Sequence, residues 1–269
     1  MIGFSRLAAL AFACIVLAAC ASTKEVYIDR PVEDLYNGAM DDLNDGSYQK
    51  AAKTFDEVDR QHPYSVWATK AQLMSAYSLY QQGRYDDSII AADRFIQLHP
   101  GHRDIAYAYY LKALDYYIQI ADVARDQKTT EQALNALSEV VRRFPDSKYA
   151  RDARLKMDLA RDHLGGKEMD IGRWYERQGS YLAAINRFKI VVDQYQTTTH
   201  VPEALERLTE CYLALGLTDE ARRTAAVLGY NYPGSEWYTD TYALVTGAPT
   251  AASAANERSW FGRVVSSIF

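Results

Sequence analysis

The sequence predicts an all-α fold, a solenoid of about five stacked helical hairpins, because one spacing of residues recurs along it. A full copy opens on a glycine and continues with residues at steps of 2, 5, 9 and 17, where the last residue is a proline. Three copies keep every step: Gly46, Tyr48, Ala51, Phe55 and Pro63; Gly83, Tyr85, Ser88, Ala92 and Pro100; Gly216, Thr218, Ala221, Ala225 and Pro233. Two copies are partial: Gly179, Tyr181, Ala184 and Phe188, which run to Gln196 instead of a proline, and Ala133, Leu137 and Pro145.

Each step of this spacing has a physical cause in a helical hairpin. Glycine tolerates the backbone angles of a tight turn between two helices. A small residue five positions later lets the helices approach closely, and a bulkier one a turn further fills the gap beside it. Proline ends the second helix because it has no N–H to donate. A helix–turn–helix unit of roughly 34 residues is the signature of a tetratricopeptide (TPR) repeat.

The distances between the prolines place an insertion in the third hairpin. Pro63 and Pro100 are 37 residues apart, whereas Pro100 and Pro145 are 45 residues apart. We therefore expect the extra residues around Asp122 to Thr130, between the two helices of the third unit.

Residues 1–19 have the composition of a lipoprotein signal peptide. Arg6 precedes an apolar run from Leu7 to Ala19 that is too short for a permanent membrane-spanning helix. The run closes on Leu-Ala-Ala-Cys20, which resembles a bacterial lipobox, whose cysteine becomes the acylated first residue of the mature protein. An ordinary secretory signal that happens to end on a cysteine is the alternative. Because Ala21 follows rather than aspartate, the resemblance implies a lipid anchor in the outer membrane, at its periplasmic face.

Cysteine content and charge limit the possible chemistry. Cys14 leaves with the signal and Cys20 carries lipid, so Cys211 has no partner for a disulfide within the chain and is expected in the core. Removal of Arg6 changes the net charge from −5 to −6 for the 250 mature residues (269 − 19). This acidic chain lacks the basic face that nucleic acid requires, so we expect no nucleic-acid partner.

A flexible tether of residues 20–30 is expected before the solenoid, which we place at residues 31–245. We expect its helices at Leu35–Asn44, Tyr48–Gln61, Val66–Gln82, Tyr85–Leu98, Asp104–Ala124, Glu131–Phe144, Tyr181–Tyr195, Glu203–Leu215 and Thr218–Tyr230.

The segment between Pro145 and Gly179 is longer than one helix of a repeat. Small and apolar residues recur there at steps of three and four, with Lys167 in a gap: Ala150, Ala153, Met157, Ala160, Leu164, Ile171 and Trp174. Because the phase continues across Gly165-Gly166, we predict one long helix that the glycine pair can kink. The alternative is two helices with Gly165-Gly166 as the turn.

The end of the chain changes character. Residues 246–258 are rich in alanine, serine and threonine, which predicts a flexible linker. In the tail, residues 259–269, the apolar side chains fall on one helical face: Trp260, Phe261, Val264, Val265, Ile268 and Phe269. A short amphipathic tail suits docking on a partner or on a membrane surface, and folding back onto the last repeat as a cap is the alternative.

No sequence motif indicates catalysis, a cofactor or a metal site. His99 and His102 lie on one inter-repeat loop without a cysteine or third histidine beside them, which favours a plain loop. Tyrosine is abundant instead, with 21 residues, and it is densest in residues 104–124. Its stripes there favour the core of a solenoid, and the alternative is an aromatic wall that binds peptide.

Several segments resemble the BamD family, the lipoprotein subunit of the bacterial outer-membrane β-barrel assembly machine. They are Arg94 to Pro100 with Asp104 to Leu114 behind it, Trp174 to Gly179, and Ala183 to Phe188. The resemblance covers the mature chain to about residue 240 and implies a scaffold without enzymatic activity. It implies three kinds of partner: the barrel subunit, accessory lipoproteins of the machine, and unfolded outer-membrane proteins. Another TPR lipoprotein of the envelope, such as a pilotin or an adaptor for cell-wall enzymes, is the alternative.

By position, the resemblance implies that Asn186 and Arg187 contact the periplasmic domains of the barrel subunit. Trp174 and Tyr175, just before the same turn, are further candidates for that contact. The alternatives are a solvated helix charge for Arg187 and the core for the two aromatic residues.

The family's N-terminal repeats are thought to receive the C-terminal signal of unfolded barrel proteins. The candidates for such a client groove in this chain are aromatic: Tyr64, Trp67, Tyr107 and Tyr110. An extended peptide would be held there by aromatic packing and backbone hydrogen bonds.

Overall fold

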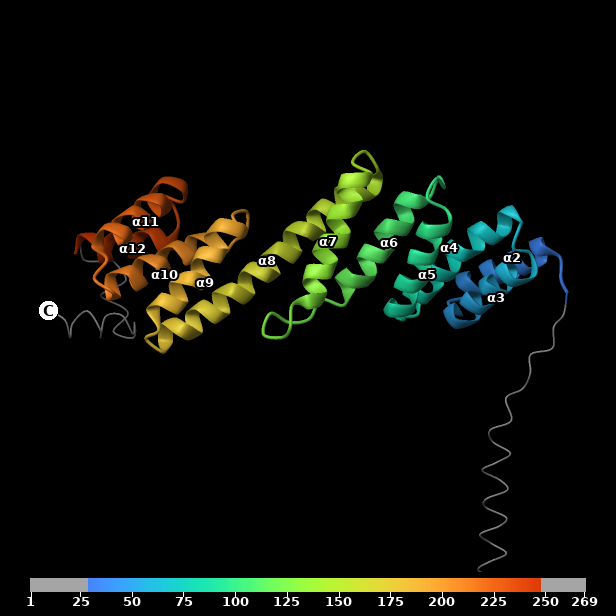
Figure 1. Cartoon of the computed structure of the whole chain (residues 1–269), viewed down its shortest axis with the longest axis horizontal. Coiled ribbons are helices and arrows are strands. Elements are labelled where there is room, and N and C mark those ends of the chain that lie inside the picture. Colours follow the sequence, from blue (N-terminus) through green and yellow to red (C-terminus); the bar gives the residue numbers. More distant parts are fainter. Residues whose placement is uncertain (1–28, 248–269) are drawn as a thin grey trace, which may run out of the picture.

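The computed structural model describes residues 29–247, and in this range it contains eleven α-helices and no strand. The helices are α2 (Val32–Asn44), α3 (Tyr48–Gln61), α4 (Val66–Gln81), α5 (Tyr85–Leu98), α6 (Ile105–Ile118), α7 (Lys128–Arg143), α8 (Lys148–Arg177), α9 (Tyr181–Gln194), α10 (Val201–Ala214), α11 (Thr218–Asn231) and α12 (Glu236–Thr246). They stack in chain order into an elongated array, with α2 at one end and α11 and α12 at the other (Figure 1). The predicted all-α solenoid is confirmed.

Four glycines make the turns that the repeat spacing predicted. Gly46, Gly83, Gly179 and Gly216 each lie between the two helices of a hairpin, with positive φ angles of 72–78°. In each case the second helix begins two residues later. A residue with a Cβ atom would be strained in this left-handed conformation, which explains why glycine recurs at the first position of the pattern.

The later steps of the pattern fall in the core between the helices. The small residues at step five are fully buried: Ala51, Ser88, Ala184 and Ala221. The residues at step nine are buried as well: Phe55, Ala92, Phe188 and Ala225. Cys211 is also fully buried, in the core around α9 and α10, as its expected core role requires.

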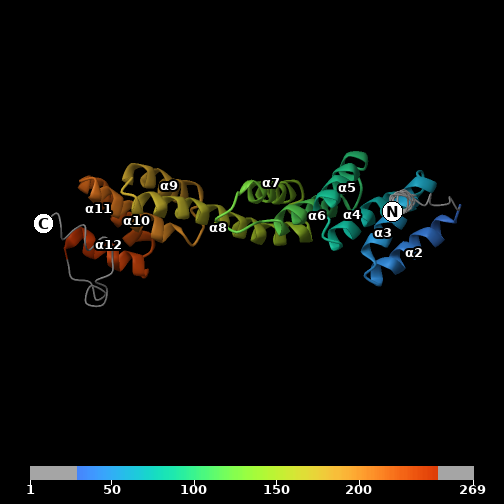
Figure 2. The ribbon, with the colours of Figure 1, turned by 90° about the horizontal axis from the view of Figure 1, so that it is seen from below.

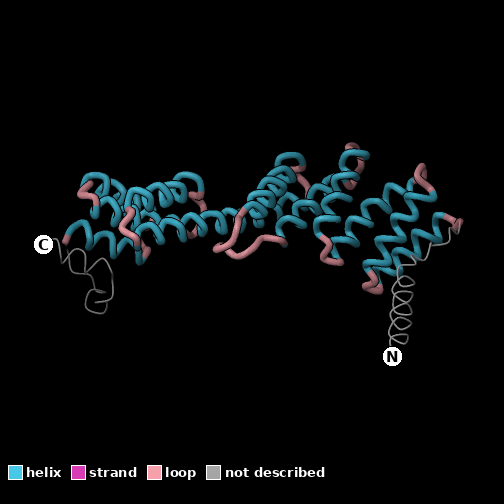
Figure 3. The backbone as a smooth tube through the Cα atoms, turned by 60° about the horizontal axis from the view of Figure 1, so that its bottom comes forward, coloured by secondary structure: helices cyan, strands magenta, loops and turns pink. Residues whose placement is uncertain are grey.

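The helix predicted at Asp104–Ala124 is too long, because α6 ends at Ile118. Polar side chains satisfy the backbone of the following loop: Asp122 accepts from the backbone N of Ala124 at 2.8 Å, and Gln127 Nε2 donates to the carbonyl oxygens of Asp122 and Arg125, each at 3.1 Å. These bonds compete with the helical ones, so the loop replaces the last turns of the predicted helix. The insertion in the third hairpin is this loop, shown between α6 and α7 in Figure 3.

Residues 148–177 form one helix, α8, as predicted. Gly165 and Gly166 are buried inside it, and Cβ atoms there would lie 3.4 Å from Thr198 and 3.1 Å from His200. The pair therefore gives room to the loop before α10 and does not form a turn. α8 belongs to two repeats, since it packs on α7 and on α9 and spans the middle of the array (Figure 2).

The buried face of α8 changes along the helix. The positions predicted to be buried are buried as far as Leu164 but not beyond it. Beyond it, Met169, Gly172 and Glu176 are buried, whereas Trp174 is 51% exposed. The change follows from the neighbours: one half of α8 is covered by α7 and the other half by α9. The helix α12 was not predicted as a separate element.

Some predictions concern residues outside the described range. They are the signal peptide of residues 1–19, the lipidated Cys20, most of the tether, the linker beyond Gly247 and the tail of residues 259–269. Among the described residues, no helix is both long enough and apolar enough to cross a membrane.

Candidate partner-binding surfaces

Tyr107 and Tyr110 belong to a continuous row of aromatic rings across three stacked helices. From α4 to α8 the ring centroids are separated by 6.4 Å (Tyr77–Tyr80), 6.5 Å (Tyr77–Tyr107), 5.5 Å (Tyr107–Tyr149) and 5.1 Å (Tyr149–Tyr110). We call these five residues the tyrosine ladder. Sequence reasoning missed Tyr77, Tyr80 and Tyr149, because stacking of α4, α6 and α8 is what brings them to Tyr107.

Tyr107 and Tyr110 of the ladder have partly buried side chains. Burial raises the pKa of Tyr107 and Tyr110, and the Asp152 carboxylate, which accepts a hydrogen bond from the Tyr110 hydroxyl, raises the pKa of Tyr110 further. Both phenols therefore stay protonated at physiological pH. The two side chains are partly exposed, so their rings offer an apolar surface that suits a peptide that is partly apolar.

The structure does not bring Tyr64 and Trp67 into this ladder. The Trp67 ring lies 4.7 Å from that of Tyr36 and packs against the core between α2 and α3. Tyr64 is fully exposed on the turn before α4. In the described part of the chain, neither residue has a ring contact with a ladder tyrosine.

Trp174 and Tyr175 lie at the end of α8, beside an open cavity of about 270 Å³. Their rings meet edge to face at 5.0 Å, with Tyr175 against the C-terminal core and Trp174 half exposed. The cavity reaches back to Ala124 in the loop after α6, where Lys167 Nζ donates to the carbonyl oxygen at 3.0 Å.

Asn186 and Arg187 lie on α9, just after the turn at Gly179. Asn186 is exposed, as is Leu182 one helical turn before it. Arg187 forms an ion pair with Glu168 of α8 at 3.0 Å, and its side chain remains 38% exposed. The guanidinium is thus held in place by one carboxylate while part of it faces solvent.

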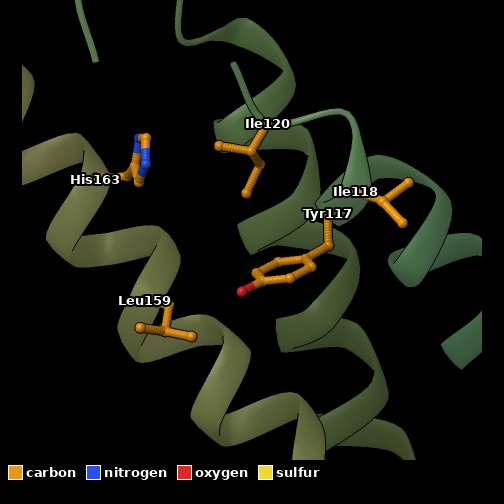
Figure 4. Close-up of a pocket in the computed structure, with 5 residues that line it drawn as sticks. All are labelled: Tyr117, Ile118, Ile120, Leu159 and His163. Atoms are coloured by element: carbon orange, nitrogen blue, oxygen red, sulfur yellow. The ribbon is translucent and has the colours of Figure 1, made fainter. Parts of the chain in front are cut away.

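A second open cavity, of about 320 Å³, lies between the end of α6 and the middle of α8 (Figure 4). Tyr117 points across it from α6 toward α8, whereas Ile118 points away. Leu159 and His163 line its α8 side, and Leu159 is more than half exposed. Both cavities therefore open along the same helix.

A group of charges is buried where α8, α10 and α12 meet. Arg207 lies 2.7 Å from Glu210, 3.7 Å from Glu203 and 3.9 Å from Glu176. We call Arg207 with Glu176, Glu203, Glu206 and Glu210 the Arg207 cluster. Burial raises the pKa of Glu206 to about 9 and that of Glu176 to about 8, and in both cases the neighbouring Glu210 raises it further. Both side chains therefore hold a proton at neutral pH. Glu203 has a second arginine beside it, since Arg173 donates to its carboxylate at 3.0 Å.

His99 and His102 make local contacts in their loop. His99 Nε2 lies 2.8 Å from Gln72 Oε1, and His102 Nδ1 accepts from the backbone N of Asp104 at 3.1 Å. Between residues 29 and 247, no group of three or more metal-binding side chains is arranged to hold an ion.

Residues 28–228 match the family model YfiO, described as an outer membrane lipoprotein. The outer membrane protein assembly factor BamD of Caulobacter vibrioides is 53% identical over 233 residues, which cover 85% of this chain and 76% of that protein. The BamD protein of Rickettsia prowazekii is 48% identical over 240 residues, covering 89% of this chain and 96% of that protein. A solved TPR protein from Thermus thermophilus is 19% identical with a TM-score of 0.38, covering 81% of this chain and 100% of that one.

Proposed function

This chain belongs to the BamD family of outer membrane assembly factors, and from that premise we propose that it is a non-catalytic scaffold for assembly of β-barrel proteins. The match of most of the chain to these relatives is the observation that carries the proposal. Lipid on Cys20 would hold the solenoid at the periplasmic face of the outer membrane. A rigid stack of hairpins can then present two separate surfaces to two kinds of partner.

The first surface would bind the periplasmic domains of the barrel subunit through Trp174, Tyr175, Asn186 and Arg187. Support comes from their exposure around one turn: a half-exposed tryptophan, an exposed asparagine and a partly exposed arginine. Aromatic residues and arginine are enriched at protein interfaces. Arg187 can exchange its bond to Glu168 for a forked bond to a carboxylate of the partner.

We expect Arg187→Glu to weaken binding of the barrel subunit's periplasmic domains by about tenfold or more, since it replaces attraction to a carboxylate by repulsion. Binding to the purified lipidated chain can be measured by calorimetry. Glu168→Gln is the control for loss of the internal ion pair, and Arg142→Glu, at an exposed position of α7, is the control for charge alone. Equal affinity of Arg187→Glu and the unchanged chain would remove Arg187 from the interface.

The second surface would bind unfolded barrel proteins along the tyrosine ladder, with Trp67 and Tyr64 as more distant contacts. Stacked rings with protonated hydroxyls suit the aromatic and backbone groups of an extended peptide. The ladder lies in the N-terminal half of the solenoid and in the first turn of α8. A client could therefore be held apart from the barrel-subunit surface.

We expect the double variant Tyr107→Leu, Tyr110→Leu to bind a peptide from the C-terminus of a barrel protein about tenfold more weakly, because two aromatic contacts are lost. Leucine keeps the buried part of each site apolar. Fluorescence anisotropy of a labelled peptide gives the affinity, and Tyr230→Leu, at an exposed tyrosine on α11, is the matched control. The ladder is not the client surface if the double variant and the control bind alike.

A further inference from the structure

The last described helix, α12, begins and ends like the first helix of a hairpin. Ser235 follows Pro233-Gly234 and accepts from the backbone N of Tyr238 at 3.2 Å. Ser65 and Ser147, each two residues after a proline, cap α4 and α8 in the same way. At its other end α12 stops at Gly247, whose φ of 69° is left-handed like that of the four glycines inside the hairpins.

α12 is also seated on the preceding hairpin as a first helix would be. Trp237 and Tyr238 pack against the C-terminal core, and the Trp237 ring lies 5.9 Å from the Arg207 guanidinium carbon. A Cβ atom at Gly229 of α11 would lie 2.5 Å from the Tyr238 ring, so the glycine is what allows this close contact.

The position where a second helix would cover α12 is open among residues 29–247. In the first helix of every earlier hairpin, the residue five places before the end of the helix is buried. These residues are Ala39, Ala76, Ala113, Gly172 and Thr209. In α12 this residue is Thr241, which is already fully buried against α10 and α11 and therefore does not mark the open flank. The next residue, Tyr242, is 52% exposed.

Charge indicates what could cover this flank. α12 contains the acidic residues Glu236 and Asp240 and no lysine or arginine. A fitting occupant is therefore apolar on one face and basic. Residues 258–269 contain Arg258 and Arg263, no aspartate or glutamate, and six apolar side chains at helical spacing.

We propose that residues 258–269 of the same chain dock on the open flank of α12 and complete a sixth hairpin. The connection is long enough: the 13 residues from Gly247 to Trp260 can span roughly 40 Å, while α12, with 11 residues, is about 16 Å long. The left-handed turn at Gly247 can direct the chain back along α12, as the other glycines do. Docking would cover Tyr242 and close the C-terminal end of the solenoid, independently of the proposed function.

Hydrogen exchange on the lipidated mature chain in detergent tests this docking. We expect amides of α12 to exchange about tenfold faster in Phe261→Asp, because the variant loses an apolar anchor. A chain that ends at Glu257 should show the same increase, and Ser266→Asp, on the opposite face of the tail, should not. The exchange rates of amides in α2 and α3 should be the same in these three altered chains as in the unchanged chain.

Three results would overturn the proposal. The first is equal exchange of α12 in Phe261→Asp and the unchanged chain. The second is protection of α12 that rises with protein concentration, which would make a second copy the occupant. The third is protection that appears only when vesicles of phosphatidylglycerol are added, which would assign the tail to the membrane.

Discussion

Replacement of Gly172 by alanine is expected to destabilise the C-terminal half of the solenoid by about 2 kcal/mol or more, although alanine normally favours a helix. A Cβ atom at this position would lie 2.4 Å from Cε1 of Phe188 and within 2.9 Å of two further ring atoms. Phe188 is fully buried in the core between α8, α9 and α10 and cannot rotate away. The two helices must therefore separate, which removes packing from the whole hairpin.

Gly38→Ala is the matched control, because Gly38 also lies inside a helix but has no atom within 4 Å of a Cβ. It should stabilise the N-terminal hairpin by about 0.5–1 kcal/mol. Hydrogen exchange measured helix by helix separates the two effects, since repeats in a solenoid open locally. We therefore expect Gly172→Ala to lower the free energy of unfolding and Gly38→Ala to raise it. Stabilisation by Gly172→Ala would show that α8 and α9 are not packed as described.

Replacement of Arg207 by alanine is expected to cost about 3 kcal/mol in the C-terminal hairpins, because it leaves buried carboxylates without their counter-charge. Arg207 faces Glu176, Glu203 and Glu210. It lowers the pKa of Glu176 and Glu206, both of which burial raises. Its loss should therefore push both values higher.

The destabilisation should also depend on pH in a defined direction. A buried glutamate with a raised pKa binds its proton more tightly in the folded state, so stability is full at low pH and is lost as pH rises. For Glu206 the loss extends from the ordinary value of 4.5 to about 9. We therefore expect Arg207→Ala to be more harmful at pH 8 than at pH 5 in thermal unfolding. Adding Glu206→Gln should recover part of the loss at pH 8, and an effect equal at both pH values would contradict this account.

The repeat spacing predicted the turns because a left-handed glycine is a local requirement of the chain. Gly46 and Gly216 would be needed whatever packs around them. The end of α6 could not be predicted in this way, since the apolar pattern continues past Ile118 while Asp122 and Gln127 bond the backbone of a loop. Likewise, the buried face of α8 depends on which neighbour covers each half, and the sequence of α8 does not contain that information.

In the candidate sites too, residues close together in the sequence could be predicted, whereas residues brought together by stacking could not. Tyr107 and Tyr110 stood out because they lie together on one helix, but Tyr77 and Tyr149 join them only through stacking. The Arg207 cluster could not be predicted from the sequence, because acidic residues at helical spacing along α10 are typical of a solvent-exposed helix face. Burial by α8 and α12 is what turns that face into part of the core.

Depletion of the protein from cells, followed by quantification of folded β-barrel proteins in the outer membrane, tests the central claim most directly. If the chain is a scaffold for barrel assembly, folded barrel proteins should decrease as it is depleted, and unfolded ones should accumulate in the periplasm. Normal insertion of barrel proteins in depleted cells would contradict the account.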